Sequence, residues 1–208
     1  MPYGFAGCGF IGYVLNIDHA LINAFARNNP GLTMIEKPLV RVGDEYVIAR
    51  LYEAMVDCLL AVELFEMSIT RSAAGKAFSA VRALMSALIV KYSDKLIETA
   101  KDDKERAWLA RKAHVVPTHS MKSLALYLKR VGVDLGDVVD KALSLHAYRY
   151  NGFEPGFSPY DRIEPVVEDV NYVVTSIPRL IERYFPERYG ELMDLAKRIR
   201  AVKVGEVK

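Results

Sequence analysis

The stretch TRSAAGKAFSAVRALMSALIVKY, Thr70 to Tyr92, decides the fold class of this chain. Its large apolar side chains recur at steps of three and four residues, the spacing of one face of an α-helix. A second stripe, of alanines, would let another helix approach closely. The stripes are formed by Ala74, Ala77, Phe78, Val81, Leu84, Met85 and Leu88, and by Ala73, Ala80, Ala83 and Ala87. The stretch predicts a long helix that is capped by Thr70 and continues past Tyr92.

Helical patterns continue on both sides of this stretch. Asp44 is the expected N-cap of a preceding helix that reaches Phe65. Pro117 and Thr118 begin a third helix, which Gly132 ends. A fourth helix is expected to start with Asp134 as its cap and to carry Leu135, Val138, Val139, Ala142 and His146 on one face.

The rest of the chain supplies a fifth helix and two terminal segments. Ser158 and Pro159 have the cap-then-proline form that opens a helix, and Pro178 is expected to kink this helix in its later half. The sequence KDDKERAW reads as a charged connection or a last helical turn. A short amphipathic tail helix is expected over Glu187 to Val202.

These patterns together predict an all-α fold, an antiparallel up-and-down bundle of four to five helices. The predicted parts are an N-terminal extension over residues 1–33, the bundle over residues 34–186 and the tail helix over residues 187–208. Met34 would serve as an alternative start, and we hypothesise that the extension is dispensable.

Composition limits the class of protein and the cellular compartment that we expect for this chain. The 208 residues are 51% hydrophobic, enough for a sizeable core, and their formal net charge of +2 excludes a histone-like polycation. The two cysteines form no disulfide framework and no metal-ligand spacing, which favours a reducing cytoplasm. No glutamine occurs, as is typical of proteins from hot environments. The apolar N-terminal segment is interrupted by polar residues, so we expect no membrane span.

Three segments carry a resemblance to a known group of proteins. RSAAGKAFSAVRALMSALI, PTHSMKSLALYL and LHAYRYNGF follow one another on successive predicted helices. Together they resemble the HEPN superfamily of small helical bundles, and most closely its archaeal PaREP-type branch, over about Glu36 to Phe185. The resemblance implies a bundle that forms homodimers and binds RNA or a nucleotide. In many relatives it also implies metal-independent RNA cleavage, with no cofactor, by a His and an Arg four to six residues apart.

His146 matches the histidine of the family pattern, but the residues that precede His146 depart from that pattern. Lys141, Asp140 and Val139 stand where the arginine is expected, and Arg149 follows His146 by three residues. The candidate catalytic residues are therefore His146, as the group that moves a proton, and Arg149, as the phosphate clamp. Lys141 and Tyr150 are the expected binding residues of the same cleft. The alternative is a core histidine held by Tyr148, Tyr150 or a backbone group.

Lys104 to Arg130 is the most basic segment of the chain. It contains Arg111, Lys112 and His119 as further candidates for binding a nucleic acid or nucleotide, with Trp108 and Tyr127 as candidate stacking surfaces. His119 stands near the expected start of the third helix, where backbone N–H groups bind anions. The alternatives are solvated helix faces, a core tryptophan and an ordinary cap at Thr118.

Three functions fit these observations. The first is a HEPN-like protein that binds RNA or a nucleotide with a degenerate cleavage motif. The second is a divergent ribonuclease that uses His146. The third is a protein-interaction module, such as the partner of a nucleotidyltransferase in a toxin–antitoxin pair, with the alanine stripe and the tail helix as its interface.

Overall fold

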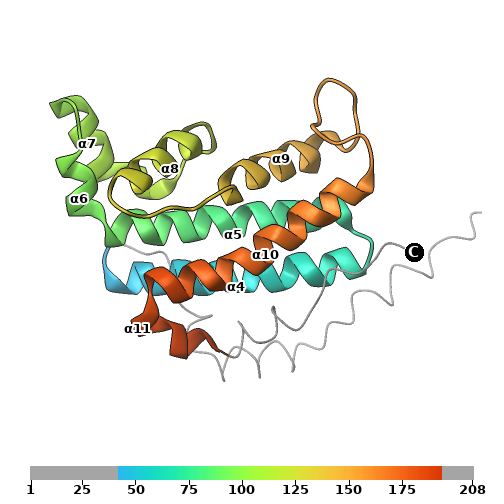
Figure 1. Ribbon diagram of the computed structural model, residues 1–208, viewed down its shortest axis with the longest axis horizontal. Coiled ribbons are helices and arrows are strands. Elements are labelled where there is room, and N and C mark those ends of the chain that lie inside the picture. Colours follow the sequence, from blue (N-terminus) through green and yellow to red (C-terminus); the bar gives the residue numbers. More distant parts are fainter. Residues whose placement is uncertain (1–41, 194–208) are drawn as a thin grey trace, which may run out of the picture.

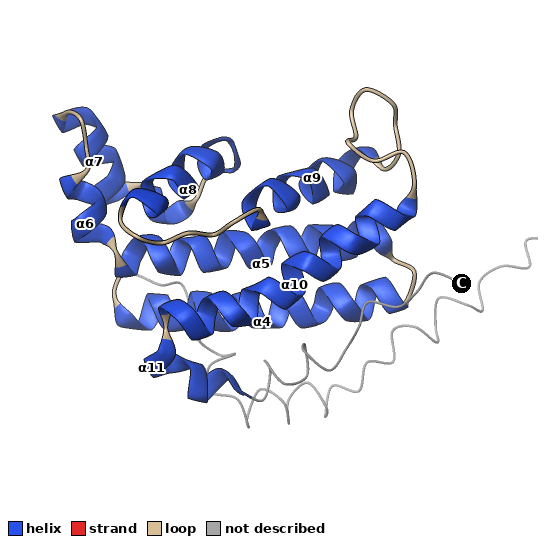
Figure 2. Ribbon diagram, in the orientation of Figure 1, coloured by secondary structure: helices blue, strands red, loops and turns tan. Residues whose placement is uncertain are grey.

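The computed structural model of the chain describes residues 42–193, and within them every regular element is a helix (Figures 1 and 2). This confirms the predicted all-α class. The α-helices are α4 (Asp44–Glu66), α5 (Thr70–Lys91), α6 (Ser93–Glu98), α7 (Asp103–Arg111), α8 (Met121–Arg130), α9 (Val138–Asn151), α10 (Ile163–Tyr184) and α11 (Pro186–Tyr189). Short 3-10 turns cover Ala113–Val115, Thr118–Ser120 and Gly190–Leu192.

Four long helices, α4, α5, α9 and α10, form a bundle with α5 at its centre. Successive long helices run in alternating directions, and α6, α7 and α8 lie toward one end (Figure 1). The helix α5 packs against α4, α9 and α10, with α4 as its most extensive neighbour. Both predicted stripes of α5 are buried, because a helix with neighbours on three sides needs more than one apolar face.

The central position of α5 also explains its apolar composition. Among the described helices, α5 alone is long and apolar enough to cross a membrane, but 78% of that stretch is buried inside the bundle. Its alanines at positions 73, 80, 83 and 87 are almost fully covered. Small side chains there leave room for three neighbouring helices.

Two predicted helix starts are wrong by one residue, and one predicted helix end differs as well. Gly43 occupies the N-cap position of α4, and Asp44 is the first residue of the helix. Thr70 is likewise the first residue of α5, and its hydroxyl pairs at 2.8 Å with the hydroxyl of Tyr148 instead of capping the helix. The helix α5 ends at Lys91, before the expected continuation past Tyr92.

The segment KDDKERAW forms a helix of its own rather than a connection. Asp102 caps α7 by accepting a hydrogen bond from the backbone N–H of Glu105 at 2.7 Å. Glu105 in turn accepts a hydrogen bond from the backbone N–H of Lys101 at 2.6 Å, so two donors at the helix start are satisfied.

Asp134 and Ser158 close turns, although each was predicted to open a helix. The carboxylate of Asp134 accepts a hydrogen bond from the N–H of Gly136 at 2.9 Å, and α9 begins only at Val138. The hydroxyl of Ser158 accepts one from the N–H of Tyr160 at 3.2 Å, and α10 begins at Ile163. A side chain that bonds two residues ahead stabilises a turn, and such turns look like caps in a sequence.

The predictions for the termini lie mostly outside the described residues. This holds for the extension over residues 1–33 and for the tail helix after Met193. The first positions of that expected tail are occupied by α11 and a 3-10 turn, and Pro178 stands buried inside α10.

Candidate functional site

His146 lies in the seam between α9 and α5. Its ring packs against Phe78 with centroids 4.2 Å apart and planes tilted by 34°, and the ring of Tyr150 meets it edge-on at 5.1 Å. The Nδ1 atom is shielded from solvent and has no hydrogen-bond partner among residues 42–193. Tyr148, an expected partner of this ring, instead pairs with Thr70. The histidine is therefore packed by aromatic rings and keeps unused hydrogen-bonding capacity.

The surroundings of His146 favour its neutral form. Burial lowers the pKa of the imidazole below its ordinary value of 6.5, and the positive charges of Arg149 and Arg82 lower it further. A neutral imidazole carries one donor and one acceptor nitrogen. At neutral pH the side chain can therefore accept a proton on its unprotonated ring nitrogen.

Arg149 lies across α5 at a position that only glycine leaves open. A Cβ atom at Gly75 would stand 2.7 Å from the Cδ atom of Arg149. The two residues line a small cavity of about 310 Å³, together with Leu64, Ser72, Lys76 and Ser79. The glycine inside helix α5, which is unfavourable for a helix, is thus explained by close contact with a side chain of α9.

Arg71 fixes the end of the helix that carries Arg149. Its Nε atom donates a hydrogen bond to the carbonyl oxygen of Arg149 at 2.8 Å, and its Nη2 atom donates to the carbonyl oxygen of Tyr150. These are carbonyl groups of the last turn of α9, which lack partners inside their own helix. The start of α5 therefore holds the end of α9 in place.

Lys76 joins α5 to α4 through an ion pair. Its Nζ atom binds Asp57 of α4 at 2.8 Å, and Asp57 is only 5% exposed. Burial raises the pKa of Asp57 above its ordinary value of 3.8, although the lysine opposes this rise. Burial likewise raises the pKa of Glu53, one turn earlier on α4.

Arg82 is the site residue that the sequence analysis missed. Its guanidinium lies 5.9 Å from the centroid of the Phe78 ring, which also packs against the ring of His146. Together with Ser72, Lys76, Ser79 and Ser86, Arg82 belongs to one face of α5, which we call the α5 polar strip. The spacing of these residues was visible in the sequence, but the helix that brings His146 to the strip was not.

Lys141 is turned toward α10 rather than toward His146. Its Nζ atom forms a hydrogen-bonded ion pair with Asp169 and lies 5.1 Å from the centroid of the Tyr172 ring. Asp169 also accepts a hydrogen bond from the hydroxyl of Tyr160 at 2.6 Å. The structure thus joins Lys141 to a partly buried network and brings Tyr150, which is 61% exposed, to the histidine.

The structure does not bring Arg111, Lys112 and His119 to this site. They are exposed on and after α7 and on the 3-10 turn before α8, at the end of the bundle away from the α9–α10 loop (Figure 1). Neighbouring cations are paired, Lys122 with Asp140 at 2.8 Å and Lys129 with Asp134 at 3.3 Å. Trp108 packs against the core, and no side-chain cap bond is made at the start of α8.

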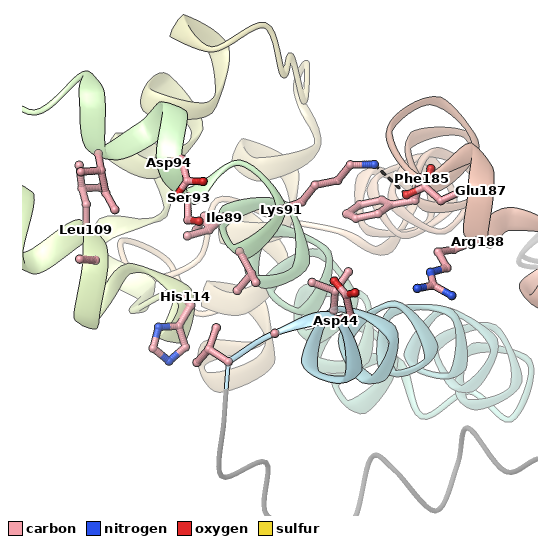
Figure 3. Close-up of a pocket in the computed structure, with 16 residues that line it drawn as sticks. Asp44, Ile89, Lys91, Ser93, Asp94, Leu109, His114, Phe185, Glu187 and Arg188 are labelled. Atoms are coloured by element: carbon pink, nitrogen blue, oxygen red, sulfur yellow. Dashed lines mark hydrogen bonds and ion pairs between the residues drawn. The ribbon is translucent and has the colours of Figure 1, made fainter.

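A cavity of about 710 Å³ lies between the start of α4, the end of α5 and α11 (Figure 3). Its central cation is already bound. The Nζ atom of Lys91 donates to the carbonyl oxygen of Tyr184 at 2.6 Å and to Glu187 at 2.9 Å. None of the residues predicted to form a site lines this cavity. Within residues 42–193 no three His, Cys, Asp or Glu residues are grouped as metal ligands.

A comparison with known protein families finds a match for part of the chain. Residues 49–171 match a family described as the archaeal PaREP1/PaREP8 family, and the match covers most of α4 and all of α5 and α9. No curated protein and no solved structure matches the chain.

Proposed function

The chain belongs to the archaeal PaREP1/PaREP8 family, and we propose that it is a HEPN-type protein that binds RNA along the α5 polar strip. One observation carries the proposal: His146, whose surroundings favour its neutral form, packs against the rings of Phe78 and Tyr150. The guanidinium groups of Arg82 and Arg149 lie 5.9 Å and 5.4 Å from the centroids of these same two rings. Both arginines are exposed, so each can contact a phosphate group from solvent. Arginine suits this task because its planar fork binds two phosphate oxygens at once.

The same arrangement supports a second candidate, a divergent metal-independent ribonuclease. The helix of His146 lacks an arginine at the expected spacing, but Arg82 of α5 supplies a guanidinium near the ring. In this candidate the imidazole takes the proton of a 2′-hydroxyl group, whose oxygen attacks the neighbouring phosphorus. The bond from phosphorus to the 5′-oxygen breaks, the imidazolium returns the proton to that leaving oxygen, and the arginines stabilise the charge that develops on the phosphate. Lys141 has no part in it, because Asp169 binds its ammonium group.

Binding is tested with a labelled single-stranded oligoribonucleotide and three variants. We expect Arg82→Ala and Arg149→Ala each to weaken binding about tenfold, the typical effect of losing a hydrogen bond to a charged group. Arg179→Ala is the matched control, because this exposed arginine lies on α10. Equal affinity of all three variants and the wild type would overturn the proposal.

Cleavage is tested in parallel with end-labelled RNA and His146→Ala. Cleavage that disappears in a still-folded His146→Ala variant would support the ribonuclease. Intact RNA with salt-sensitive binding would support the binding module. If RNA neither binds nor is cut, the remaining proposal is the protein-interaction module, and sedimentation would test the proposed homodimer and a nucleotidyltransferase partner.

A further inference from the structure

A second small cavity lies next to Arg82, on the side away from the histidine's own helix. Its volume is about 260 Å³, and its walls come from α4, α5 and the 3-10 turn after α7. The lining residues are Tyr46, Arg50, Glu53, Arg82, Ala83, Ser86, His114 and Val115. Cavities for drug-sized ligands begin at roughly 300 Å³, so this one suits a smaller group. Arg82 belongs both to this cavity and to the proposed RNA site.

One wall of the cavity is a closed hydrogen-bond network. The hydroxyl groups of Tyr46 and Ser86 pair at 2.8 Å, and Ser86 donates to the carbonyl oxygen of His114 at 2.6 Å. The ring of His114 meets that of Tyr46 at a centroid distance of 5.7 Å and nearly at a right angle. This wall is therefore fixed in place, and it presents aromatic surface to the cavity.

Two charged side chains of α4 that also line the cavity have unused hydrogen-bonding capacity. The Nε atom of Arg50 and the Oε2 atom of Glu53 are shielded from solvent and have no hydrogen-bond partner in the described part of the chain. An Nη1 atom of Arg50 lies 2.5 Å from this Oε2 atom, but the contact lacks hydrogen-bond geometry. The guanidinium rests 5.2 Å from the centroid of the Tyr46 ring. A ligand that draws the two side chains apart breaks this ion pair, and in return it can supply a hydrogen bond to each side chain.

From this pairing we infer that the cavity binds the edge of a nucleobase and prefers guanine. Arginine donates hydrogen bonds only, and an ionised glutamate accepts them only. The Watson–Crick edge of guanine offers the matching set, an O6 acceptor beside the N1–H and N2–H donors. Adenine and cytosine present an amino donor where guanine has O6, and uracil lacks the second donor. Edges of unstacked bases are the groups by which proteins read single-stranded RNA.

The inference rests on the proposed function and refines it. A base in this cavity would place its own phosphate group beside Arg82, which lies between the cavity and His146. The lining side chains Arg50, Arg82 and Glu53 carry a net charge of 1 + 1 − 1 = +1. One positive charge balances that of Glu53, and the other is left to bind a phosphate group.

The test uses labelled octaribonucleotides that are all uridine except for one central base. We expect the guanine-containing strand to bind about tenfold more tightly than the adenine or cytosine strands, the size of a good bidentate base contact. Glu53→Gln should abolish this preference, because a glutamine amide cannot accept from two donors at both of its ends. Glu66→Gln, an exposed change on the same helix, should keep it.

The outcomes separate the two proposals. Equal binding of all strands by the wild type, or an unchanged guanine preference in a folded Glu53→Gln variant, would overturn the guanine cavity and leave RNA binding intact. If no strand binds at all, the proposed function fails, and the cavity inference fails with it.

Discussion

The contact between Gly75 and Arg149 predicts opposite effects on stability and on binding. A methyl group at position 75 displaces a flexible, exposed arginine side chain, so Gly75→Ala should keep or gain stability, up to about 1 kcal/mol from helix propensity. RNA affinity should fall as far as in Arg149→Ala. Urea unfolding and RNA titration measure the two effects. A folded Gly75→Ala variant with full affinity would mean that Arg149 needs no fixed position.

The buried carboxyl group of Asp57 predicts that the free energy of unfolding depends on pH. Its pKa is raised on folding, so the folded state binds a proton more tightly than the unfolded chain. The stabilising contribution of Asp57 is complete below pH 3.8 and is lost as pH rises through the folded pKa. Asp57→Asn should remove this loss, so that the difference in unfolding free energy between variant and wild type grows from acidic to neutral pH. A pH-independent difference would contradict the prediction.

The lowered pKa of His146 predicts the opposite pH dependence, a folding stability that rises with pH. Its pKa is lowered on folding from the ordinary 6.5, so the unfolded chain takes up a proton first as pH falls. Folding stability should therefore decrease from pH 6.5 down through the folded pKa. The pKa of His114 is lowered in the same direction by burial, so His146→Phe should reduce this decrease without removing it. Unfolding curves at neutral pH and about one pH unit below 6.5 measure the difference. A His146→Phe variant with the wild-type slope would show that another group is responsible.

Contacts between single residues were predictable where they depend on one helix. The family resemblance assigned His146, Arg149 and Tyr150 to one cleft, and in the structure the ring of Tyr150 contacts both other side chains on α9. Their role in binding stays a prediction. Arg82, Arg50 and Glu53 were not found, because their importance depends on which helices become neighbours. Lys141 was assigned to the same cleft because its ion-pair partner, Asp169, lies on a different helix and could not be identified from the sequence.

At the level of elements, the hydrogen bonds of Arg71 predict where α9 is most vulnerable. Arg71→Ala leaves the carbonyl groups of Arg149 and Tyr150 without their donor, and the last turn of α9 should fray. The expected cost is about 1–2 kcal/mol, with faster amide exchange confined to the end of α9. Arg106→Ala, which removes only an exposed pair with Asp103, is the control. Uniform loss of protection over the bundle would argue against a local effect.

The helices themselves were predictable because their apolar periodicity is strong, and their boundaries were not. The carboxylates of Asp134 and Asp102 look alike in the sequence, but one closes a turn and the other caps a helix. The charged segment KDDKERAW has a weak apolar face, so its helix is recognised only once Leu109 is seen to pack on the core.

For the whole molecule, the low net charge predicts a shallow salt dependence of RNA binding. The chain carries a formal charge of only +2, and many of its cations are paired. Phosphate contacts by Arg82 and Arg149 alone give a slope of about −1.4 for the logarithm of affinity against that of salt concentration. Arg149→Ala should reduce the slope by about 0.7. A much steeper slope would point to the basic face around Arg111 and Lys112 instead.

The central place of α5 also has a consequence for the order in which the molecule folds. Only Met67–Ile69 join α4 to α5, so the largest helix pair forms at a low cost in chain entropy, before α9 and α10 have partners. Arg50, Glu53 and Arg82 then meet early in folding, whereas His146 and Arg149 arrive with α9. Substitutions in the α4–α5 seam should therefore slow refolding, and substitutions in α9 should chiefly hasten unfolding.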